Sequence, residues 1–173
     1  GLNARRTRRR RRVHIATTLQ GLEGLEGEGS GMKVVRFYAY GGPSVLVVED
    51  APPPRIDDAE DPARERVLVR VHAVAINRID EKVRRGSLRT LIAHALPLVP
   101  GWDFAGVVDG TGERVFGRCD VNANGACAEL ALVDAGALVP LSRHIDFTQA
   151  AALPTAALTA WQALDALHVR PGT

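Results

Sequence analysis

The chain has 173 residues, which is enough for one domain with a substantial core and too few for two full ones. Its 46% hydrophobic and 24% charged residues are typical of a globular protein, and no apolar stretch reaches the roughly 20 residues that cross a membrane. Only Cys119 and Cys127 are available. We therefore expect neither a disulfide framework nor a Cys-rich metal site, but reduced thiols in a cytoplasmic protein.

Residues 1–31 differ in composition from the rest of the chain. They carry seven arginines, all within Arg5–Arg12, against three glutamates, so residues 32–173 have a net charge of −2. The arginines repel one another and the Gly/Glu-rich stretch offers little apolar surface, so we predict a disordered leader and a natural start at Met32. The alternative is a targeting or nucleic-acid-binding arm. Binding through Arg5–Arg12 would be non-specific, because the leader has no aromatic residues to stack on bases.

From residue 32 onward the pattern is mainly that of strands. Segments 33–40 and 45–50 are separated by the turn signal Gly41-Gly42-Pro43, and three prolines follow at 52–54. Segment 66–76 alternates between a valine-rich face that begins at Val67 and a mixed face that begins at Leu68. This alternation predicts a half-buried strand of an antiparallel sheet or barrel.

The middle of the chain contains short helices and further strands. Asn77 or Asp80 can cap a helix that runs through Arg85 and ends at Gly86, and we expect a second short helix over 88–95. Segment 101–117 predicts two strands around a Gly-rich turn, and 126–133 predicts another alternating strand.

The last part of the chain is predicted to be helical. Asp146 and Thr148 can cap a helix over 148–153, and Pro154 can start a longer one. Short strands with Gly/Pro turns, followed by helices, predict a small β-barrel and then a helical connector.

These segments resemble, in the same order, the catalytic GroES-like domain of the medium-chain dehydrogenase/reductase superfamily. The resemblance rests on four segments, at 32–54, 67–86, 96–108 and 112–117. They match the first hairpin, the Asn-x-x-Asp signature (Asn77 and Asp80) and the Pro-Gly-x-Asp-x-x-Gly-x-Val segment, and the Gly-Glu-Arg-Val of the last resembles the family's Gly-Asp-Arg-Val turn. It implies a mainly β fold with short helices, in which a partly open β-barrel over 32–152 precedes a helical connector over 153–173.

Two departures from the family pattern are visible. Segment 106–117 is shorter than usual, because a longer Gly-containing loop normally separates its two strands. The family's first Rossmann strand and Gly-rich phosphate turn have no counterpart in these residues. We therefore expect an N-terminal fragment from which the Rossmann domain is absent.

The residues that bind zinc in other members of the superfamily are missing here. Zinc-dependent members have a Cys in the segment that matches 75–80 and a His-Glu pair after the glycine that matches Gly101. Asn77 and the pair Trp102-Asp103 occupy these places. A catalytic zinc needs about three N, S or O protein ligands, so we expect no metal. The chain is similar to the zinc-free quinone oxidoreductase, or zeta-crystallin-like, branch.

This resemblance implies a function for the full-length protein. It would be a homodimer that transfers hydride from NADPH to a quinone or another electron-poor enone or carbonyl compound. Asn77 would lie near the nicotinamide end of the cofactor, with Thr159 beside the same cleft, and Trp102 would form a wall of the substrate cleft. Each has a structural alternative: helix capping for Asn77, a bond to its own helix backbone for Thr159, and core packing for Trp102.

Other residues are expected to be structural. Asp80 would hold a local turn or pair with Arg84 or Arg85, and Asp103 would brace its loop. Backbone or turn roles are expected for three glycines, namely Gly86, Gly101 and Gly106. His72, His94 and both thiols are interpreted as passive. Tyr38 and Tyr40 are possible proton donors that nothing in the sequence distinguishes, so the catalytic residues stay unknown.

Two other functional classes compete with the oxidoreductase hypothesis. In that hypothesis the fragment is inactive by itself. The chain would otherwise be a stand-alone GroES-like interaction or scaffold module, or a nucleic-acid binder that uses its Arg-rich leader. Titration with NADPH separates the first two classes, and salt-dependent DNA binding tests the third.

Overall fold

The computed structural model describes residues 31–58, 64–92 and 94–169. The predicted leader over 1–31 therefore lies outside the described residues, apart from Gly31. The strands are β1 Met32–Phe37, β2 Leu46–Ala51, β3 Arg66–Ala75, β4 Asp103–Val108, β5 Arg114–Arg118, β6 Leu130–Asp134 and β7 Leu138–Pro140. The α-helices are α1 Arg78–Arg84, α2 Phe147–Ala151 and α3 Pro154–Ala166. Three 3-10 turns lie at Pro43–Val45, Ile56–Asp58 and Ala135–Ala137.

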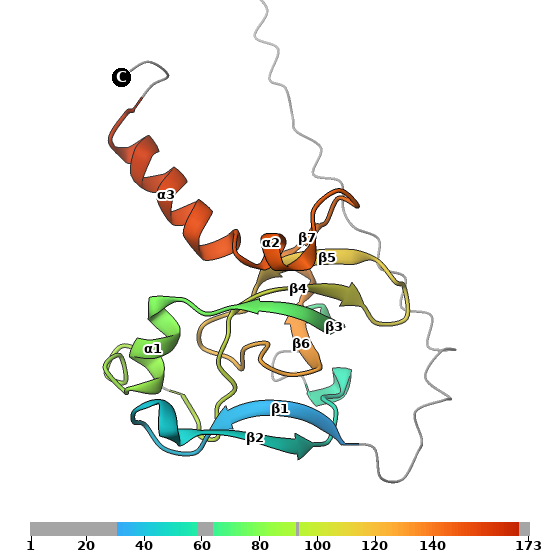
Figure 1. Ribbon diagram of the computed structural model, residues 1–173, viewed down its shortest axis with the longest axis vertical. Helices are drawn as coiled ribbons and strands as arrows, with labels where there is room; N and C mark the ends of the chain where they lie inside the picture. The colour runs from blue at the N-terminus through green and yellow to red at the C-terminus, as the bar shows by residue number, and fades with distance from the viewer. Residues whose placement is uncertain (1–30, 59–63, 93, 170–173) are drawn as a thin grey trace, which may run out of the picture.

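The strands form two antiparallel sheets. Strands β1 and β2 make a hairpin, and the other five lie in the order β6-β3-β4-β5-β7 (Figure 1). Backbone hydrogen bonds join the sheets, because Val35 N donates to Cys127 O at 2.8 Å and Phe37 N to Leu98 O at 3.0 Å. The expected mainly β, partly open GroES-like arrangement is confirmed, as two open sheets rather than a closed barrel. No Rossmann fold is present among the described residues.

The main core lies between the hairpin and the five-stranded sheet. Strand β3 alternates as predicted, with Val67 and Val69 buried and Arg70 exposed. The largest side chains with no more than 1% exposure are Trp102, Phe37 and Phe104. A smaller cluster forms where α2 packs on β3 and β4, and it includes Ala105 and Leu141. Burial of these apolar side chains is the main source of stability.

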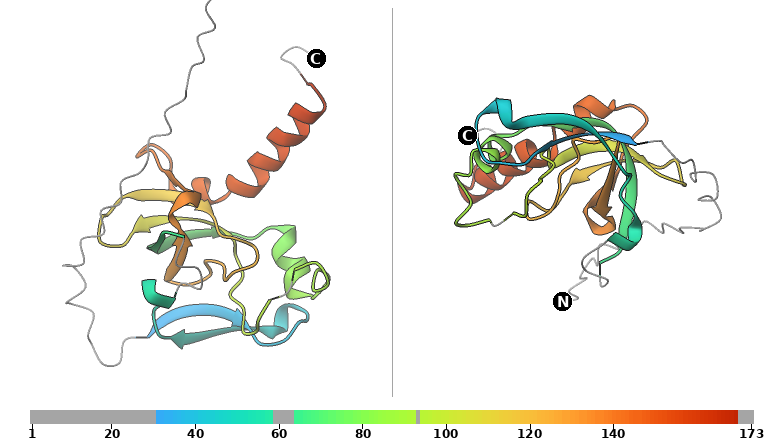
Figure 2. Two further views of the ribbon diagram at one scale, coloured as in Figure 1. Left: turned by 180° about the vertical axis from the view of Figure 1, so that it is seen from behind. Right: turned by 90° about the horizontal axis from the view of Figure 1, so that it is seen from below.

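The helices differ strongly in how they contact the sheets. Helix α1 begins after Asn77 and ends at Arg84, and Gly86 follows its C-cap with a φ of +75°, the left-handed conformation expected after a helix. In α2, Asp146 accepts a hydrogen bond from Gln149 N at 2.7 Å, as its capping role predicts. Helix α3 begins at Pro154 and projects away from the sheets (Figures 1 and 2), and none of its residues is buried.

The helix predicted over 88–95 is wrong. The described residues of this segment form turns, in which Leu91 N bonds to Leu88 O at 2.9 Å and Arg89 N bonds to Gly86 O at 3.3 Å. A helix of this length is marginal without tertiary support, and Leu91 is 81% exposed. Strand β7 was not anticipated, because only three residues pair with β5. No helix in the described parts of the chain has the length and apolar character needed to span a membrane.

Candidate active site

A fully buried carboxylate, Asp103, lies at the start of β4 where three elements meet. Its Oδ2 accepts hydrogen bonds from the Asn77 side-chain amide at 3.0 Å and from Thr155 N at 2.8 Å. Its Oδ1 accepts from the Thr155 hydroxyl at 2.7 Å, and Arg118 Nε lies 3.6 Å away. Asp103 therefore ties together α1, β5 and the first turn of α3, which is more than the bracing of its own loop that we expected.

Asn77 lies between two buried carboxylates. Its side-chain amide donates to Asp103, and its backbone N donates to Asp80 Oδ2 at 2.7 Å in a capping box at the start of α1. An asparagine amide has two N–H donors, and Asp103 uses one of them. Asn77 as a whole is only partly buried.

Asp80 fixes the segment that leads into β4. Its Oδ1 accepts from Gly101 N at 2.7 Å, and the residue is only 3% exposed. Burial raises the pKa of this carboxyl, while the backbone N–H donors of Asn77 and Gly101 act in the opposite direction. Of the two roles expected for Asp80, the structure has the local turn, through its bond to Asn77 N, and not the pairing with an arginine, because Arg84 bonds to Gly41 O and Arg85 pairs with Glu81 at 2.9 Å.

Two glycines allow close packing around this segment. Gly101 has a φ of +83°, and a Cβ there would lie 2.5 Å from both Cys127 Sγ and Val74 Cγ1. A Cβ at Gly106 would lie 2.2 Å from Arg70 O, so β4 could not approach β3 with a larger residue. Both contacts explain physically why glycine is suited to these positions.

The predicted cofactor and cleft residues occupy different environments. Trp102 is 1% exposed, belongs to the main core, and donates from Nε1 to Ala123 O at 3.0 Å. This burial favours the packing role for Trp102 over the substrate-cleft role. Thr159 is exposed on α3, four residues after Thr155 and therefore on the same helix face. The structure thus brings Asn77 into the Asp103 cluster and leaves Thr159 at its edge.

Sequence reasoning missed Arg118 and Thr155. The Arg118 guanidinium donates from Nε to the Thr155 hydroxyl at 3.1 Å and is 38% exposed, so one of its sides faces solvent. A signal for Arg118 was present, because an antiparallel hairpin centred on Gly110–Gly112 places it opposite Asp103, and the structure has this pair. Nothing comparable marks Thr155, which depends on where α3 docks.

The remaining candidate groups lie outside this cluster. Burial raises the pKa of Cys119 to about 12 and that of Cys127 to about 11, so neither is a thiolate at neutral pH. Tyr38 donates to Glu49 at 2.6 Å within the hairpin, and this hydrogen bond raises the pKa of the phenol. His72 stacks on Phe147 with ring centres 4.5 Å apart. Among the described residues, no three His, Cys, Asp or Glu side chains are grouped to hold a metal ion.

The chain is similar in sequence to known proteins. Residues 63–143 match the model of the alcohol dehydrogenase GroES-like domain. The chain is similar to a chloroplastic quinone-oxidoreductase homolog of Spinacia oleracea, 34% identical over 144 residues that cover 77% of this chain and 42% of the relative. The quinone oxidoreductase of Rattus norvegicus is also 34% identical, over 77% of this chain and 40% of its own length.

The chain is also similar to solved structures of quinone oxidoreductases. The quinone oxidoreductase of Coxiella burnetii superposes with a TM-score of 0.70 at 31% identity, over 83% of this chain and 47% of that one. That of Thermus thermophilus, whose complex with NADPH has been solved, has a TM-score of 0.66 at 34% identity, over 82% of this chain and 43% of that one. The chain therefore spans less than half the length of these relatives, which are named quinone oxidoreductases or a homolog of one.

Proposed function

Because residues 63–143 form an alcohol dehydrogenase GroES-like domain, we propose that the chain is the substrate-domain part of an NADPH-dependent, zinc-independent oxidoreductase. The reaction would be hydride transfer to a quinone or another electron-poor enone or carbonyl compound. The observation that carries this proposal is the similarity to quinone oxidoreductases over 77% of the chain. NADPH would supply the hydride, and the protein would supply orientation and exclusion of water.

The Asp103 cluster fits a role beside the nicotinamide end of the cofactor. Asp103 holds the amide of Asn77 from one side, and the capping box fixes its backbone from the other. The second amide N–H of Asn77 can then donate to a carbonyl oxygen of a bound molecule without reorganisation of the protein. Thr159 would add a hydroxyl from the same face of α3 as Thr155.

The residues at the positions of the zinc ligands support zinc independence. Four groups surround the Asp103 carboxylate, and Trp102, at the position of a zinc-binding residue in related enzymes, is inside the core. A neutral amide such as that of Asn77 is not among the usual zinc ligands. Charge that develops on a substrate oxygen would thus be stabilised by hydrogen bonds, and no single side chain is proposed as the proton donor.

The proposal assigns different roles to two parts of the chain. Residues 32–152 would form the substrate domain, and residues 153–173 would connect it to a nucleotide-binding domain. No described strand leads through a Gly-rich turn into a helix N-terminus that could hold the pyrophosphate. We therefore propose that residues 1–173 alone are inactive. A cytoplasmic location and a homodimeric full-length enzyme belong to the same proposal.

A chimera tests the proposed reaction. Residues 32–173 would replace the aligned N-terminal segment of the rat quinone oxidoreductase, and NADPH oxidation would be measured with a quinone substrate. We expect activity that survives metal chelation. A folded chimera that binds NADPH and reduces no quinone or enone would contradict the proposed reaction.

Asn77→Ser in this chimera tests the cofactor contact. Serine keeps a capping oxygen at the start of α1 but removes the amide that donates to Asp103, so the melting temperature should fall and the kinetics are measured well below it. We expect the KM for NADPH to rise about tenfold, which corresponds to one lost hydrogen bond. Thr159→Val should have a smaller effect in the same direction, and Leu158→Val on the neighbouring position should have none.

A scaffold or interaction module is the second candidate function. The observation that favours it is the exposure of Trp161 on α3 and of Leu167 at its C-cap, both 74%. Calorimetric titration of the 173-residue chain with NADPH separates the two functions. Binding weaker than millimolar by this chain, together with an active chimera, would support the oxidoreductase. A chimera that folds but cannot bind NADPH would favour the interaction module.

A further inference from the structure

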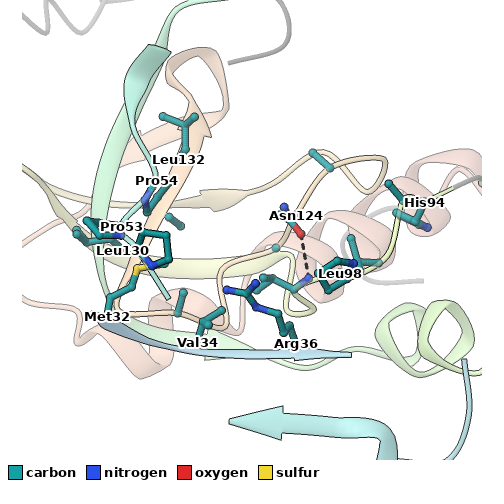
Figure 3. Close-up of a pocket in the computed structure, with 18 of the residues that line it drawn as sticks. Met32, Val34, Arg36, Pro53, Pro54, His94, Leu98, Asn124, Leu130 and Leu132 are labelled. Carbon is teal, nitrogen blue, oxygen red and sulfur yellow. Dashed lines mark hydrogen bonds between the residues drawn. The ribbon is translucent and has the colours of Figure 1, made fainter. Parts of the chain in front are cut away.

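A second polar feature, separate from the Asp103 cluster, lies between the hairpin and the edge strand β6. Here the structure has a pocket of about 450 Å³, a volume typical of small-molecule sites. Figure 3 shows its apolar end, formed by Met32, Pro53, Pro54, Leu130 and Leu132, and its polar end, with Arg36, His94 and Asn124. None of the side chains that bind Asp103 lines this pocket.

The charges that line the pocket are unbalanced. Arg36 and Arg66 line it, and among the described residues no aspartate or glutamate does. Arg36 is already paired, because its Nε lies 2.9 Å from Glu49 Oε1. Arg36 and Arg66 both have a buried Nε that makes no hydrogen bond, but in the described parts of the chain only Arg36 of the two lies within ion-pair distance of a carboxylate. The positive charge of Arg66 is therefore not compensated within the pocket.

The acidic residue paired with Arg66 across the sheet is engaged elsewhere. Asp134 lies opposite Arg66 in the β3–β6 ladder. Its Oδ1 accepts from Gly136 N at 2.8 Å, and its Oδ2 lies 3.6 Å from Arg64 Nη1. A carboxylate that enters the pocket would therefore meet a guanidinium whose charge has no carboxylate partner among the described residues.

We infer that this pocket binds a small amphipathic carboxylate, with the carboxylate on Arg66 and an aliphatic body along the apolar wall. A carboxylate matches the planar guanidinium fork, which can donate two parallel hydrogen bonds. The aliphatic side chains of the wall, such as Leu130 and Leu132, suit a hydrocarbon chain rather than a second charge. This site is distinct from the proposed hydride-transfer site and does not depend on it.

Calorimetric titration of the full 173-residue chain with octanoate tests the inference, with octanol as the uncharged probe of equal chain length. We expect one octanoate per chain and at least tenfold weaker binding of octanol. Arg66→Gln should weaken octanoate binding about tenfold or more. The matched control is Arg70→Gln on the same strand, which pairs with Asp109 outside the pocket and should leave the affinity unchanged.

Thermal melts verify that the variants are folded. Arg66→Gln should melt no lower than the wild type without ligand, because it removes an unpartnered buried charge, and should lose the stabilisation that octanoate gives. Equal affinity for octanol and octanoate, unchanged affinity in Arg66→Gln, or no binding to a folded chain would each overturn the inference. No cofactor or quinone is present in this experiment, so its failure leaves the oxidoreductase proposal unaffected.

Discussion

The five-stranded sheet and helix α3 represent two extremes of packing within one short chain. The sheet buries its apolar residues and satisfies Asp103 with groups from three elements, whereas α3 has no buried residue. The boundary between the two regions is Thr155, the last residue of α3 that is bonded to Asp103. Stability and the proposed site should therefore depend on residues up to Thr155. The exposed apolar residues of α3 that follow Thr155 should contribute little to folding.

The sharpest test of this comparison is Asp103→Asn. The asparagine would present an NH₂ group among the donors Asn77, Thr155 and Arg118, and one buried charge of the Asp103–Arg118 pair would be lost. We expect a loss of about 3–5 kcal/mol in the free energy of unfolding, measured by urea denaturation. Asp109→Asn is the control, because Asp109 pairs with the exposed Arg70, and it should cost less than about 1 kcal/mol. Equal losses would break the comparison.

A pair of glycines tests the tight packing of the sheet region. Gly101 and Gly110 have nearly the same φ, +83° and +82°, but only Gly101 has atoms within 4 Å of the position that a Cβ would take. We expect Gly101→Ala to cost about 3 kcal/mol from combined strain and overpacking, and Gly110→Ala about 1 kcal/mol from backbone strain alone. Thermal unfolding of both variants measures the difference, and similar melting temperatures would contradict it.

The pH dependence of stability gives a smaller effect in the same region. Burial raises the folded-state pKa of Asp80 above its ordinary value of 3.8, so the folded state holds this proton more tightly than the unfolded state. The contribution of Asp80 to stability is therefore greatest below 3.8 and declines as the pH rises through the folded-state pKa. The Asp80→Asn variant has no titrating group at this position. The amount by which its free energy of unfolding falls below that of the wild type should therefore shrink as the pH rises through the folded-state pKa. Urea titrations at several pH values measure it, and a deficit that grows would be the contrary result.

The smallest effect is expected on α3. Trp161 is 74% exposed and Leu164 is 50% exposed, so replacing either by glutamine should change the free energy of unfolding by no more than about 0.5 kcal/mol. Chemical denaturation of the two single variants provides the measurement. A loss above about 1 kcal/mol would show that α3 packs on the sheets in solution, and the contrast between the two regions would then fail.

The sequence predicted most of the fold because its signals are local. The alternation in β3, the cap at Asn77 and the helix start at Pro154 depend on neighbouring residues, and the structure agrees with each. The helix over 88–95 was wrong because so short a helix needs tertiary contacts, and Leu91 is exposed.

The candidate site was harder to predict because it depends on contacts between distant residues. Asp103 and Thr155 are 52 residues apart, and no spacing rule connects them. Trp102 illustrates a second limit, since a large aromatic residue beside a family motif is equally compatible with a cleft and with a core. Only the folded structure shows that Trp102 lies in the core, with its indole N–H bound to the Ala123 carbonyl.

The geometry of the β4–β5 hairpin also bears on how this region tolerates insertions and deletions. Val107 pairs with Arg114 next to the tip, whereas Asp103 pairs with Arg118 at the opposite end of the ladder. Residues added to or removed from the tip change only the loop, provided that the strands keep their register. A change in the length of the tip would therefore leave the Asp103–Arg118 pair intact.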